Sequence, residues 1–588
     1  MTALLTDNLP LLAGAPNGIK KLRELILELA VRGKLVPQDP SDKPACELLK
    51  RIAEEKARLV AEGKIKKQKA LAAIGGKEGP FDLPNGWVSV PLMEIAALVT
   101  DGDHQPPPKA VEGVPFLVIG NLNTGRVCFD DCRRVPADYF AALDWGRKPT
   151  RGDILYTVTG SFGIAVMVDV DDPFCVQRHV AIIKVSRSSP SAYLKVLLGS
   201  PYAKSYAELI ATGIAQKTVP LTGLRQLVVP LPPLAEQHRI VAKVDELMAI
   251  CDRLEAQQAD AESAHAQLVQ ALLGSLIQEA SAATDLTARD GGNAENAGAI
   301  FGLANWQRLA EHFHTLFTTE PSIDALKQTL LQLAVMGKLV PQNSSEEPAS
   351  ALVKRIQAEK QRYLAVSKAR KQKDLATDSR LEPPFEIPVS WEWQTIDDVL
   401  HVTGGVTLGR KLGGRKLLSK PYLRVANVQR GRLELDHIKE VEVPEDEVEK
   451  YLLQSGDLLI TEGGDWDKVG RTATWRDELP ECLHQNHVFR ARAVVSDWEP
   501  RWAEMYLNSA TAREYFAGSS KQTTNLASIN MTQLRACAFP LPPLAEQHRI
   551  VAKVDQLMAL CDQVKNRLTQ ARQLNEQLAS TLVEQAVA

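Results

Sequence analysis

The stretch PLPPLAEQHRIVAKVDELMAICD, from Pro230 to Asp252, occurs twice in this sequence. A second copy, PLPPLAEQHRIVAKVDQLMALCD, runs from Pro540 to Asp562 and differs from the first at only two positions. In each copy a proline pair stands before an acidic residue, which is how helices commonly begin. Apolar residues then recur at steps of four and three, so each copy predicts a long amphipathic helix.

Each predicted helix carries one apolar seam with heptad spacing. The seam residues that we expect to contact a partner are Ile240, Val244, Leu247 and Leu254 in the first copy and Ile550, Val554, Leu557 and Val564 in the second. Weaker continuations run through Leu268 and Leu272, and through Leu568, Leu578 and Leu582. Two helices with one seam each would most simply pair with each other. Periodicity does not choose the partner, so two helices packed separately on two domains remain an alternative.

The repetition extends beyond the long helices. ELAVRGKLVPQ at Glu28–Gln38 returns as QLAVMGKLVPQ at Gln332–Gln342, and PFDLPNGW at Pro80–Trp87 returns as PFEIPVSW at Pro384–Trp391. In the stretches that follow, short β-branched and aromatic runs alternate with Gly and Asp turns, which predicts β-rich domains with some helix. These two stretches share a few landmarks: Asn121 with Asn427, Gly152-Asp153 with Gly456-Asp457, and Gln177-x-His179 with Gln485-x-His487.

The sequence therefore predicts an α+β chain of two pseudo-repeated halves, each with a helical arm, a mixed α/β, β-rich domain and a long helix. The expected boundaries are 1–80 for the first arm, 81–229 for the first β-rich domain, 230–280 for the first long helix, 281–308 for a linker, 309–383 for the second arm, 384–539 for the second β-rich domain and 540–588 for the second long helix. Two similar frames that hold two diverged domains favour two equivalent partner contacts and two different ligands. Recent gene conversion between the two helices remains an alternative explanation of their similarity.

Composition narrows the class of protein. The 69 basic and 72 acidic residues leave a formal charge of -3, so a nucleic-acid-binding surface would have to be local. The eight cysteines are scattered and form no CxxC pair, which favours reduced thiols in a cytoplasmic protein and no metal site. We expect no membrane span and no secretory signal, because no apolar run reaches 18 residues.

The motif P-L-P-P-L-x-E-Q-x-x-I stands at Pro230–Ile240 and again at Pro540–Ile550, each time after a β-rich domain. In this respect the whole chain resembles the specificity subunit of type I DNA restriction-modification systems. The resemblance implies two target-recognition domains that read a bipartite, asymmetric DNA site and are held apart by an antiparallel coiled coil of the two long helices. It also implies three kinds of partner: double-stranded DNA, two methyltransferase (modification) subunits and restriction-translocase subunits. S-adenosylmethionine, ATP and Mg would be used by those partners, and no cofactor would be bound by this chain.

Motifs that imitate catalytic sites are incomplete. Glu382–Phe385 is close to the motif of amino-methyltransferases, but no F-x-G-x-G cofactor loop accompanies it. Gly404–Lys411 imitates a phosphate loop, yet Arg410 stands where a lysine is needed. We therefore expect a protein without a catalytic centre of its own. A coiled-coil scaffold that binds only proteins remains an alternative, as does a self-sufficient methyltransferase or nuclease.

Candidate DNA-binding residues lie in loops of both β-rich domains. Glycines allow close backbone approach to DNA, and Gln, Asn and Lys are residue types that read purine edges. The candidates are Thr159, Gly160, Ser161, Gly463 and Asp465 after a strong strand, Gln216, Lys217, Lys521, Gln522 and Asn525 before the long helices, and Gln177, His179, Gln485 and His487 in the shared landmark. Each of them has a plain alternative as a solvated turn or a structural residue.

Overall fold

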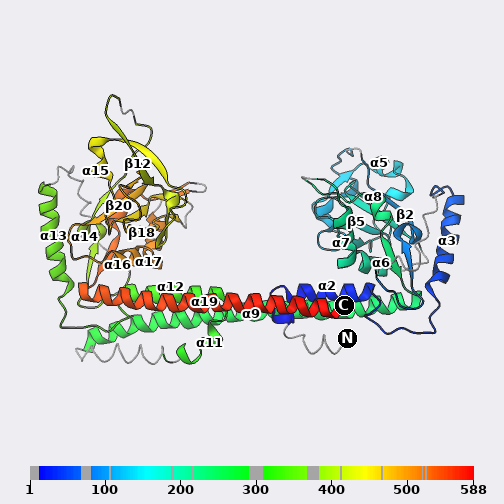
Figure 1. Ribbon diagram of the computed structural model, residues 1–588, viewed down its shortest axis with the longest axis horizontal. Coiled ribbons are helices and arrows are strands. Elements are labelled where there is room, and N and C mark those ends of the chain that lie inside the picture. The colour runs from blue at the N-terminus through cyan, green and yellow to red at the C-terminus, as the bar shows by residue number, and fades with distance from the viewer. Residues whose placement is uncertain are drawn as a thin grey trace. The chain divides into compact units, whose positions relative to one another are not determined.

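The computed structural model describes residues 12–67, 81–104, 107–186, 191–213, 216–290, 307, 309–366, 383–410, 413–464, 468–519, 521–523 and 526–587. The chain divides into two compact units. Unit 1 comprises Met1–Ala261 and Ala571–Ala588, and unit 2 comprises Glu262–Gln570. Each unit therefore contains one arm, one β-rich domain and parts of both long helices, α9 (Leu234–Asp290) and α19 (Leu544–Val587) (Figure 1).

The β-rich domain of unit 1 is built on a four-stranded antiparallel sheet in the order β2-β8-β5-β6. A second sheet has the order β4-β3-β7, and β1 pairs with β9. The strands are β1 (Val88–Pro91), β2 (Ala96–Asp101), β3 (Val114–Leu117), β4 (Arg133–Val135), β5 (Ile154–Thr157), β6 (Ala165–Met167), β7 (Cys175–Val176), β8 (Val180–Val185) and β9 (Val228–Leu231). The helices are α4 (Leu92–Ile95), α5 (Ala137–Ala142), α6 (Ser191–Leu198), α7 (Pro201–Ile210), α8 (Leu221–Arg225) and the short η1 (Ile119–Leu122) and η2 (Trp145–Arg147).

Unit 2 repeats this topology with the orders β11-β20-β16-β18 and β15-β12-β19, and with β10 paired to β23. It adds the hairpin β13-β14 and the small sheet β17-β22-β21. The strands are β10 (Glu392–Thr395), β11 (Leu400–Thr403), β12 (Leu417–Leu423), β13 (Val428–Gln429), β14 (Arg432–Leu433), β15 (Lys439–Pro444), β16 (Leu458–Thr461), β17 (Gly463–Gly464), β18 (Thr472–Thr474), β19 (Leu483–His484), β20 (Val488–Ala493), β21 (Lys521–Thr523), β22 (Leu526–Ser528) and β23 (Ala538–Leu541). The helices are α14 (Ile396–Val399), α15 (Val448–Tyr451), α16 (Pro500–Leu507), α17 (Ala510–Ser519), α18 (Met531–Ala536) and the short η3 (Val425–Asn427) and η4 (Glu445–Glu447). The predicted mixture of helices and strands in two repeated halves is confirmed.

The strands β5 and β16 each begin with three buried aromatic or aliphatic residues, because both faces of the strand are covered. Ile154 and Tyr156 of β5 belong to a core shared with α6 and the arm, whereas Leu155 belongs to the core on the opposite face. Alternate residues of a strand point to opposite faces, so a strand buried on both sides loses the polar alternation of a surface strand.

Each arm packs on the β-rich domain of its own unit. The arm helices are α2 (Gly18–Val31) and α3 (Ala45–Ala61) in unit 1, and α11 (Phe313–Leu316), α12 (Glu320–Val335) and α13 (Ala349–Val366) in unit 2. Leu48 and Ile52 of α3 are buried in the core that contains β5. Leu352 and Ile356 of α13 are buried in the corresponding core of unit 2.

Three repeated motifs of unit 1 meet at one buried carboxylate. Glu236, in the first turn of α9, accepts hydrogen bonds from Gln38 Nε2 at 2.6 Å and from Trp87 Nε1 at 2.9 Å. Burial raises the pKa of Glu236 despite these two donors. In unit 2, Glu546 accepts a hydrogen bond from Gln342 Nε2 in the same way. The arm and the start of the long helix are thus joined by the residues that the repeat preserves.

The long helices pack against the arms as well as against each other within each unit. In unit 1 one core cluster contains Leu22 and Ile26 of α2, Ile240 and Val244 of α9, and Ala579 of α19. In unit 2 another cluster contains Leu326 and Leu330 of α12, Val269 and Leu273 of α9, and Cys561 of α19. An arm helix therefore packs with both long helices in each cluster, where the sequence alone suggested that the two long helices pair only with each other.

The expected seam residues lie in or against these cores. Ile240 and Val244 are buried, with Leu247 and Leu254 packed against the same cluster. Ile550 and Val554 are buried in the main core of unit 2, and Leu557 and Val564 pack against the cluster that contains Val269 and Cys561.

The expected continuation of the seam is wrong by one residue at Leu268, Leu272 and Leu578, whereas Leu568 packs against the unit 2 cluster and Leu582 is half-buried, as expected. Leu268 is 52% exposed whereas its neighbour Val269 is 2% exposed, and Leu272 and Leu578 are exposed beside buried Leu273 and Ala579. Val269 lies 18 residues after buried Cys251, and Ala579 lies 18 residues after buried Cys561. Eighteen residues are five turns at 3.6 residues per turn, so the buried face follows a straight α-helix and not a heptad repeat of 3.5. The first long helix also continues past residue 280 to Asp290.

Candidate nucleic-acid interface

The Gly-Asp landmark of each β-rich domain supplies a buried ion pair. Asp153 accepts a hydrogen bond from Lys184 Nζ on β8 at 2.6 Å, and both side chains are buried. Asp457 accepts two hydrogen bonds from Arg492 on β20, each at 2.6 Å. The strand registers place Lys184 and Arg492 at equivalent positions. Burial lowers the pKa of Lys184, and its carboxylate partner opposes that shift. The shared aspartates therefore anchor the sheets.

The asparagine landmark is structural as well. The side-chain oxygen of Asn121 accepts a hydrogen bond from the Val118 amide at 3.0 Å, and Asn427 accepts one from the Arg424 amide at the same distance. Both contacts close the short helical turn after the first strand of the three-stranded sheet. The shared residues thus hold the scaffold, and differences between the domains must be sought at exposed positions beside them.

Three loops of unit 1 are joined by backbone hydrogen bonds at one end of the four-stranded sheet. The Val158 amide donates to the His179 carbonyl at 3.0 Å, and the Val219 amide donates to the Val158 carbonyl at 2.8 Å. The Gly160 amide donates to the Lys217 carbonyl at 3.0 Å. We call this arrangement the loop platform; in unit 1 it consists of Val158–Gly163, Gln177–Val180 and Gln216–Val219.

Unit 2 builds its loop platform with the same backbone contacts. The Glu462 amide donates to the His487 carbonyl at 3.0 Å, and the Ile529 amide donates to the Glu462 carbonyl at 2.9 Å. Gly463 and Gly464 pair with β22, which in turn pairs with β21. The candidate loops after the strand and before the long helix, identified separately in the sequence, therefore lie side by side in both domains.

A threonine at the end of the central strand fixes each glycine loop. The Thr157 hydroxyl donates to the Ser161 carbonyl at 2.8 Å and accepts from the Ile164 amide at 3.0 Å. The Thr461 hydroxyl donates to the Lys468 carbonyl at 2.7 Å and accepts from the Arg471 amide at 3.0 Å. The second loop is longer than the first but is closed by the same side chain. Each platform is thereby held in one backbone geometry.

The candidate residues differ in exposure. Gly160, Ser161, Gln216 and Lys217 are exposed, whereas Thr159 is only 5% exposed and its hydroxyl accepts a hydrogen bond from Thr218. Gln177, His179, Gln485, Gly463 and Gly464 are half-buried, and His487 is exposed. Lys521 and Gln522 lie on β21, where only the backbone is described. Asp465 and Asn525 lie outside the described residues, as do Glu382 and Lys411.

The two histidines of the shared landmark have different neighbours. Arg178 Nε donates to His179 Nε2 at 3.2 Å. Burial, and next the positive charge of Arg178, lower the pKa of His179, so this imidazole is neutral near pH 7 and accepts at Nε2. In unit 2 the imidazole of His487 contacts the carboxylate of Glu462, a residue that replaces Val158. Equivalent backbones thus carry different polar groups.

Sequence reasoning missed Arg178 and Asn486, whereas Glu462 lies within the predicted glycine loop of unit 2. Arg178 and Asn486 occupy the same backbone position of the Q-x-H landmark, and only the flanking Gln and His were singled out because the two domains share them. The variable x of this landmark is the signal that would have found both.

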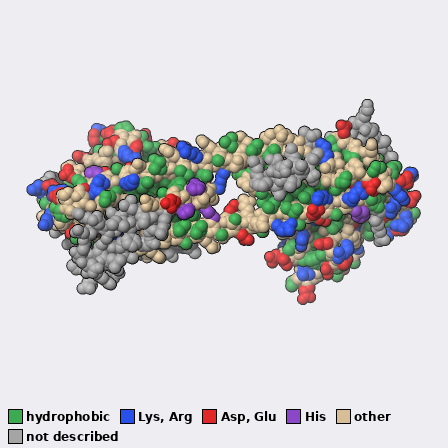
Figure 2. Space-filling model, turned by 90° about the horizontal axis from the view of Figure 1, so that it is seen from below, with side chains coloured by type: hydrophobic (Ala, Val, Ile, Leu, Met, Phe, Trp, Pro, Cys, Tyr) green, Lys and Arg blue, Asp and Glu red, His purple; other side chains and the backbone are tan. Residues whose placement is uncertain are grey.

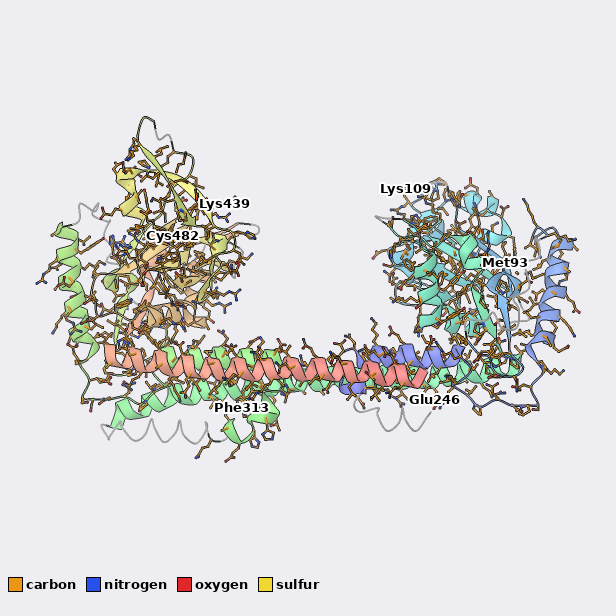
Figure 3. The ribbon with its side chains drawn as sticks, viewed as in Figure 1. Met93, Lys109, Glu246, Phe313, Lys439 and Cys482 are labelled. Carbon is orange, nitrogen blue, oxygen red and sulfur yellow. The ribbon has the colours of Figure 1, made fainter. Side chains whose placement is uncertain are left out.

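Two buried thiols of the β-rich domains, Cys175 and Cys482, are not activated nucleophiles. Cys482 lies inside the second β-rich domain, whereas Lys439 lies at its surface (Figure 3). Burial raises the pKa of Cys482 to about 12, and burial with a smaller effect of Asp103 raises that of Cys175 to about 12. A reactive cysteine needs a lowered pKa and access to solvent, and these two side chains have neither.

The described part of the chain contains no group of three His, Cys, Asp or Glu side chains that could hold a metal ion. Within that same part, no helix is both long enough and apolar enough to cross a membrane. On the face shown in Figure 2, described basic and acidic side chains are interspersed, in keeping with the nearly balanced composition.

Comparison with known proteins decides the family. A family model described as "Type I restriction modification DNA specificity domain" matches the chain twice, over residues 85–262 and 388–572. The chain belongs to the family of type I restriction-modification specificity subunits. Each match spans one β-rich domain and the first part of the long helix that follows it. The β-rich domains are thus the two target-recognition domains of this specificity subunit.

Similar proteins cover nearly the whole specificity subunit. The type I restriction enzyme EcoEI specificity subunit of Escherichia coli is 35% identical over 97% of this chain and 94% of the relative. The EcoAI specificity subunit, also from Escherichia coli, is 36% identical with the same two coverages. A solved structure described as "Structural basis underlying complex assembly and conformational transition of the type I R-M system" matches with a TM-score of 0.46 and 18% identity, covering 86% of this chain and 99% of the other.

Proposed function

We propose that this specificity subunit reads a bipartite, asymmetric DNA site, one part with each recognition domain, and that the loop platforms carry the residues that contact the bases. The observation that supports this most strongly is the combination of matching backbone hydrogen bonds with different side chains in the two platforms. A common frame with exchanged side chains suits two domains that dock on DNA alike and prefer different sequences.

The two long helices would pair as an antiparallel coiled coil that sets the gap between the two parts of the site. Packing within each unit supports this pairing, because the end of α19 packs near the start of α9 in unit 1 and the start of α19 packs near the later part of α9 in unit 2. The spacing of half-sites generally follows protein geometry. Removing one helical turn should therefore change the gap and leave both half-sites unchanged.

The chain would act without a catalytic centre of its own, in the cytoplasm, as the scaffold for two methyltransferase subunits and for restriction-translocase subunits. S-adenosylmethionine, ATP and Mg would be used by those partners and not by this chain. The repeated arm and long-helix sequences support two equivalent subunit contacts, since the arms and helix starts are nearly the same in the two halves.

The proposed function is tested by sequencing DNA methylation in a methylation-free host that expresses this chain with its cognate methyltransferase subunit. A split adenine motif with an unread gap is the expected result, because the partner would methylate one adenine in each half-site. A soluble complex that leaves no motif would favour a purely protein-binding scaffold. Methylation by the chain alone would favour a self-sufficient enzyme.

A further inference from the structure

We propose that the variable residue of the Q-x-H turn, Arg178 in the first recognition domain and Asn486 in the second, determines the identity of one base in each half-site. This assignment rests on the proposed function and adds to it the residues that distinguish guanine from adenine. The residues lie in a β-turn, because the Val180 amide donates to the Gln177 carbonyl at 2.9 Å and the Val488 amide donates to the Gln485 carbonyl at 2.9 Å.

The two turns are anchored identically on both sides. The Gln177 amide donates to the Leu117 carbonyl and the Gln485 amide to the Leu423 carbonyl, both at 2.9 Å. Two residues after each glutamine, the backbone carbonyl of His179 or His487 accepts the hydrogen bond that joins the turn to the glycine loop. The backbone at Arg178 and Asn486 is therefore held in the same way, and the side chain is what differs.

The surroundings of Arg178 leave its guanidinium suited to paired hydrogen bonding. The side chain is exposed, and its Nε is occupied by neutral His179. Among the residues that the structure describes, no other side-chain contact of Arg178 is present. A fixed Nε leaves the two terminal nitrogens to donate together, which matches O6 and N7 of guanine in the major groove.

Asn486 offers the complementary chemistry for adenine. Its backbone amide is engaged, since it donates to the Val406 carbonyl at 3.0 Å, and its side chain remains half-exposed. A carboxamide donates one hydrogen bond and accepts another, which matches N7 and the N6 amino group of adenine. The neighbouring His487 is held by Glu462, so it does not compete for the same base.

The test uses the complete complex with its methyltransferase subunits. The variants are Arg178→Ala and Arg178→Lys in the first domain and Asn486→Ala in the second, with Arg151→Ala as the matched control. Arg151 is also exposed, and it pairs with Asp171. It lies just before β5, at the opposite end of that strand from the platform. Methylation motifs and the affinities of the assembled complexes for single-base variants of the motif are measured.

Arg178→Ala should relax the motif at one base pair of one half-site, where discrimination falls about 10- to 100-fold, and Asn486→Ala should do the same in the other half-site. Arg178→Lys should retain part of the guanine preference, and Arg151→Ala should leave the motif unchanged.

Two results would overturn the assignment. One is an unchanged motif in both alanine variants. The other is a uniform loss of affinity across all sequences with a salt slope reduced by about one, which identifies a phosphate contact instead of a base contact. A wild-type complex that produces no motif contradicts the proposed function itself, so the two failures are told apart by the unsubstituted chain.

Discussion

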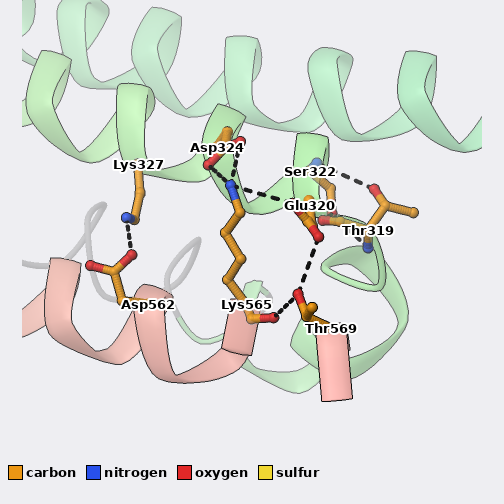
Figure 4. A network of polar contacts seen from close by, with 8 residues as sticks. All are labelled: Thr319, Glu320, Ser322, Asp324, Lys327, Asp562, Lys565 and Thr569. Carbon is orange, nitrogen blue, oxygen red and sulfur yellow. Dashed lines mark hydrogen bonds and ion pairs between the residues drawn. The ribbon is translucent and has the colours of Figure 1, made fainter. Parts of the chain in front are cut away.

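Lys565 of α19 forms an ion pair with Asp324 of α12, with Nζ 3.0 and 2.9 Å from the two carboxylate oxygens (Figure 4). At the corresponding position of the otherwise similar α9 stands Glu255, which pairs with Arg23 of α2 at 2.9 Å. The charge at this long-helix position is thus reversed between the halves, and each arm meets it with a residue of opposite charge. The two arm residues are not equivalent, since Arg23 corresponds to Lys327, which pairs with Asp562 as Arg23 pairs with Asp252. Like charges would face each other if an arm docked on the wrong long helix, so the reversal favours the correct pairing.

Lys565→Glu should weaken the docking of α12, because Asp324 and the nearby Glu320 would then face a third carboxylate. The pair is partly exposed, so we expect a loss of about 0.5–1 kcal/mol that shrinks at high salt. The double variant Lys565→Glu with Asp324→Lys should recover most of the loss. Urea unfolding of the four members of this cycle measures the coupling, and a coupling of zero at low salt would contradict the pairing argument.

Lys184→Ala should be far more destabilising than the loss of an exposed pair. It leaves Asp153 as a buried carboxylate without its cation, and breaking a buried pair in this way costs about 3–5 kcal/mol. The matched control is Arg151→Ala, which removes the exposed pair with Asp171 and should cost far less, because solvent screens that pair. Denaturant unfolding of the two variants checks the difference, and equal losses would refute the anchoring role of Asp153.

Gly33→Ala should disrupt the turn between α2 and α3. Gly33 has a φ of +68°, and an added Cβ would lie 2.5 Å from Pro84 Cγ. Gly63 has a φ of +69° with no atom within 4 Å of its added Cβ, so Gly63→Ala isolates the backbone cost of about 1–2 kcal/mol. Gly33→Ala should lower the free energy of unfolding by more than Gly63→Ala does, because it adds the clash with Pro84 to the backbone cost. Equal melting temperatures of the two variants would show that Pro84 moves aside for the added Cβ without a measurable cost.

Unit 2 should lose stability on mild acidification. Burial lowers the pKa of His401 to about 4 and that of His484 to about 3, well below the ordinary value of 6.5. The unfolded chain therefore binds more protons below pH 6.5, and the free energy of unfolding falls as the pH drops from about 6.5 to 4, by up to about 1.4 kcal/mol per pH unit for each histidine.

His484→Val tests this acid sensitivity, because Val176 occupies the equivalent place in the first domain. The variant should show a shallower decline of unfolding free energy between pH 6.5 and 4 than the unsubstituted chain. An unchanged slope would mean that His484 is protonated as readily in the folded state as in the unfolded state.

The internal repeat made the order of arms, β-rich domains and long helices predictable, but not how its motifs meet. The stretches around Gln38, Trp87 and Glu236 were recognisable as separate repeated motifs. Their convergence on one buried carboxylate depends on packing between segments far apart in the chain, which no local pattern records. The predicted continuation of the apolar seam through Leu268 was wrong for a related reason. A heptad and a straight helix coincide over the first turns and separate by one residue near Val269.

In the candidate site too, the loops were predictable from the sequence but their contacts were not. The loops rich in glycine and in side-chain amides were predicted from residue type. The structure brings the loop at Gly160 together with the segment at Lys217 through a backbone hydrogen bond. Thr159 was predicted to face DNA, but its side chain is buried because it closes the platform from within. Arg178 has no local signature, because its role depends on a turn that exists only once the sheet has formed.

The central claim is that each recognition domain reads its own half-site through its own platform. The most direct measurement is the methylation motif of a chain in which residues 384–539 are replaced by a second copy of residues 81–229, assembled with the same methyltransferase. We predict a motif in which the first half-site occurs twice, in inverted orientation, because the long helices are proposed to run antiparallel. Retention of the original asymmetric motif would contradict the account.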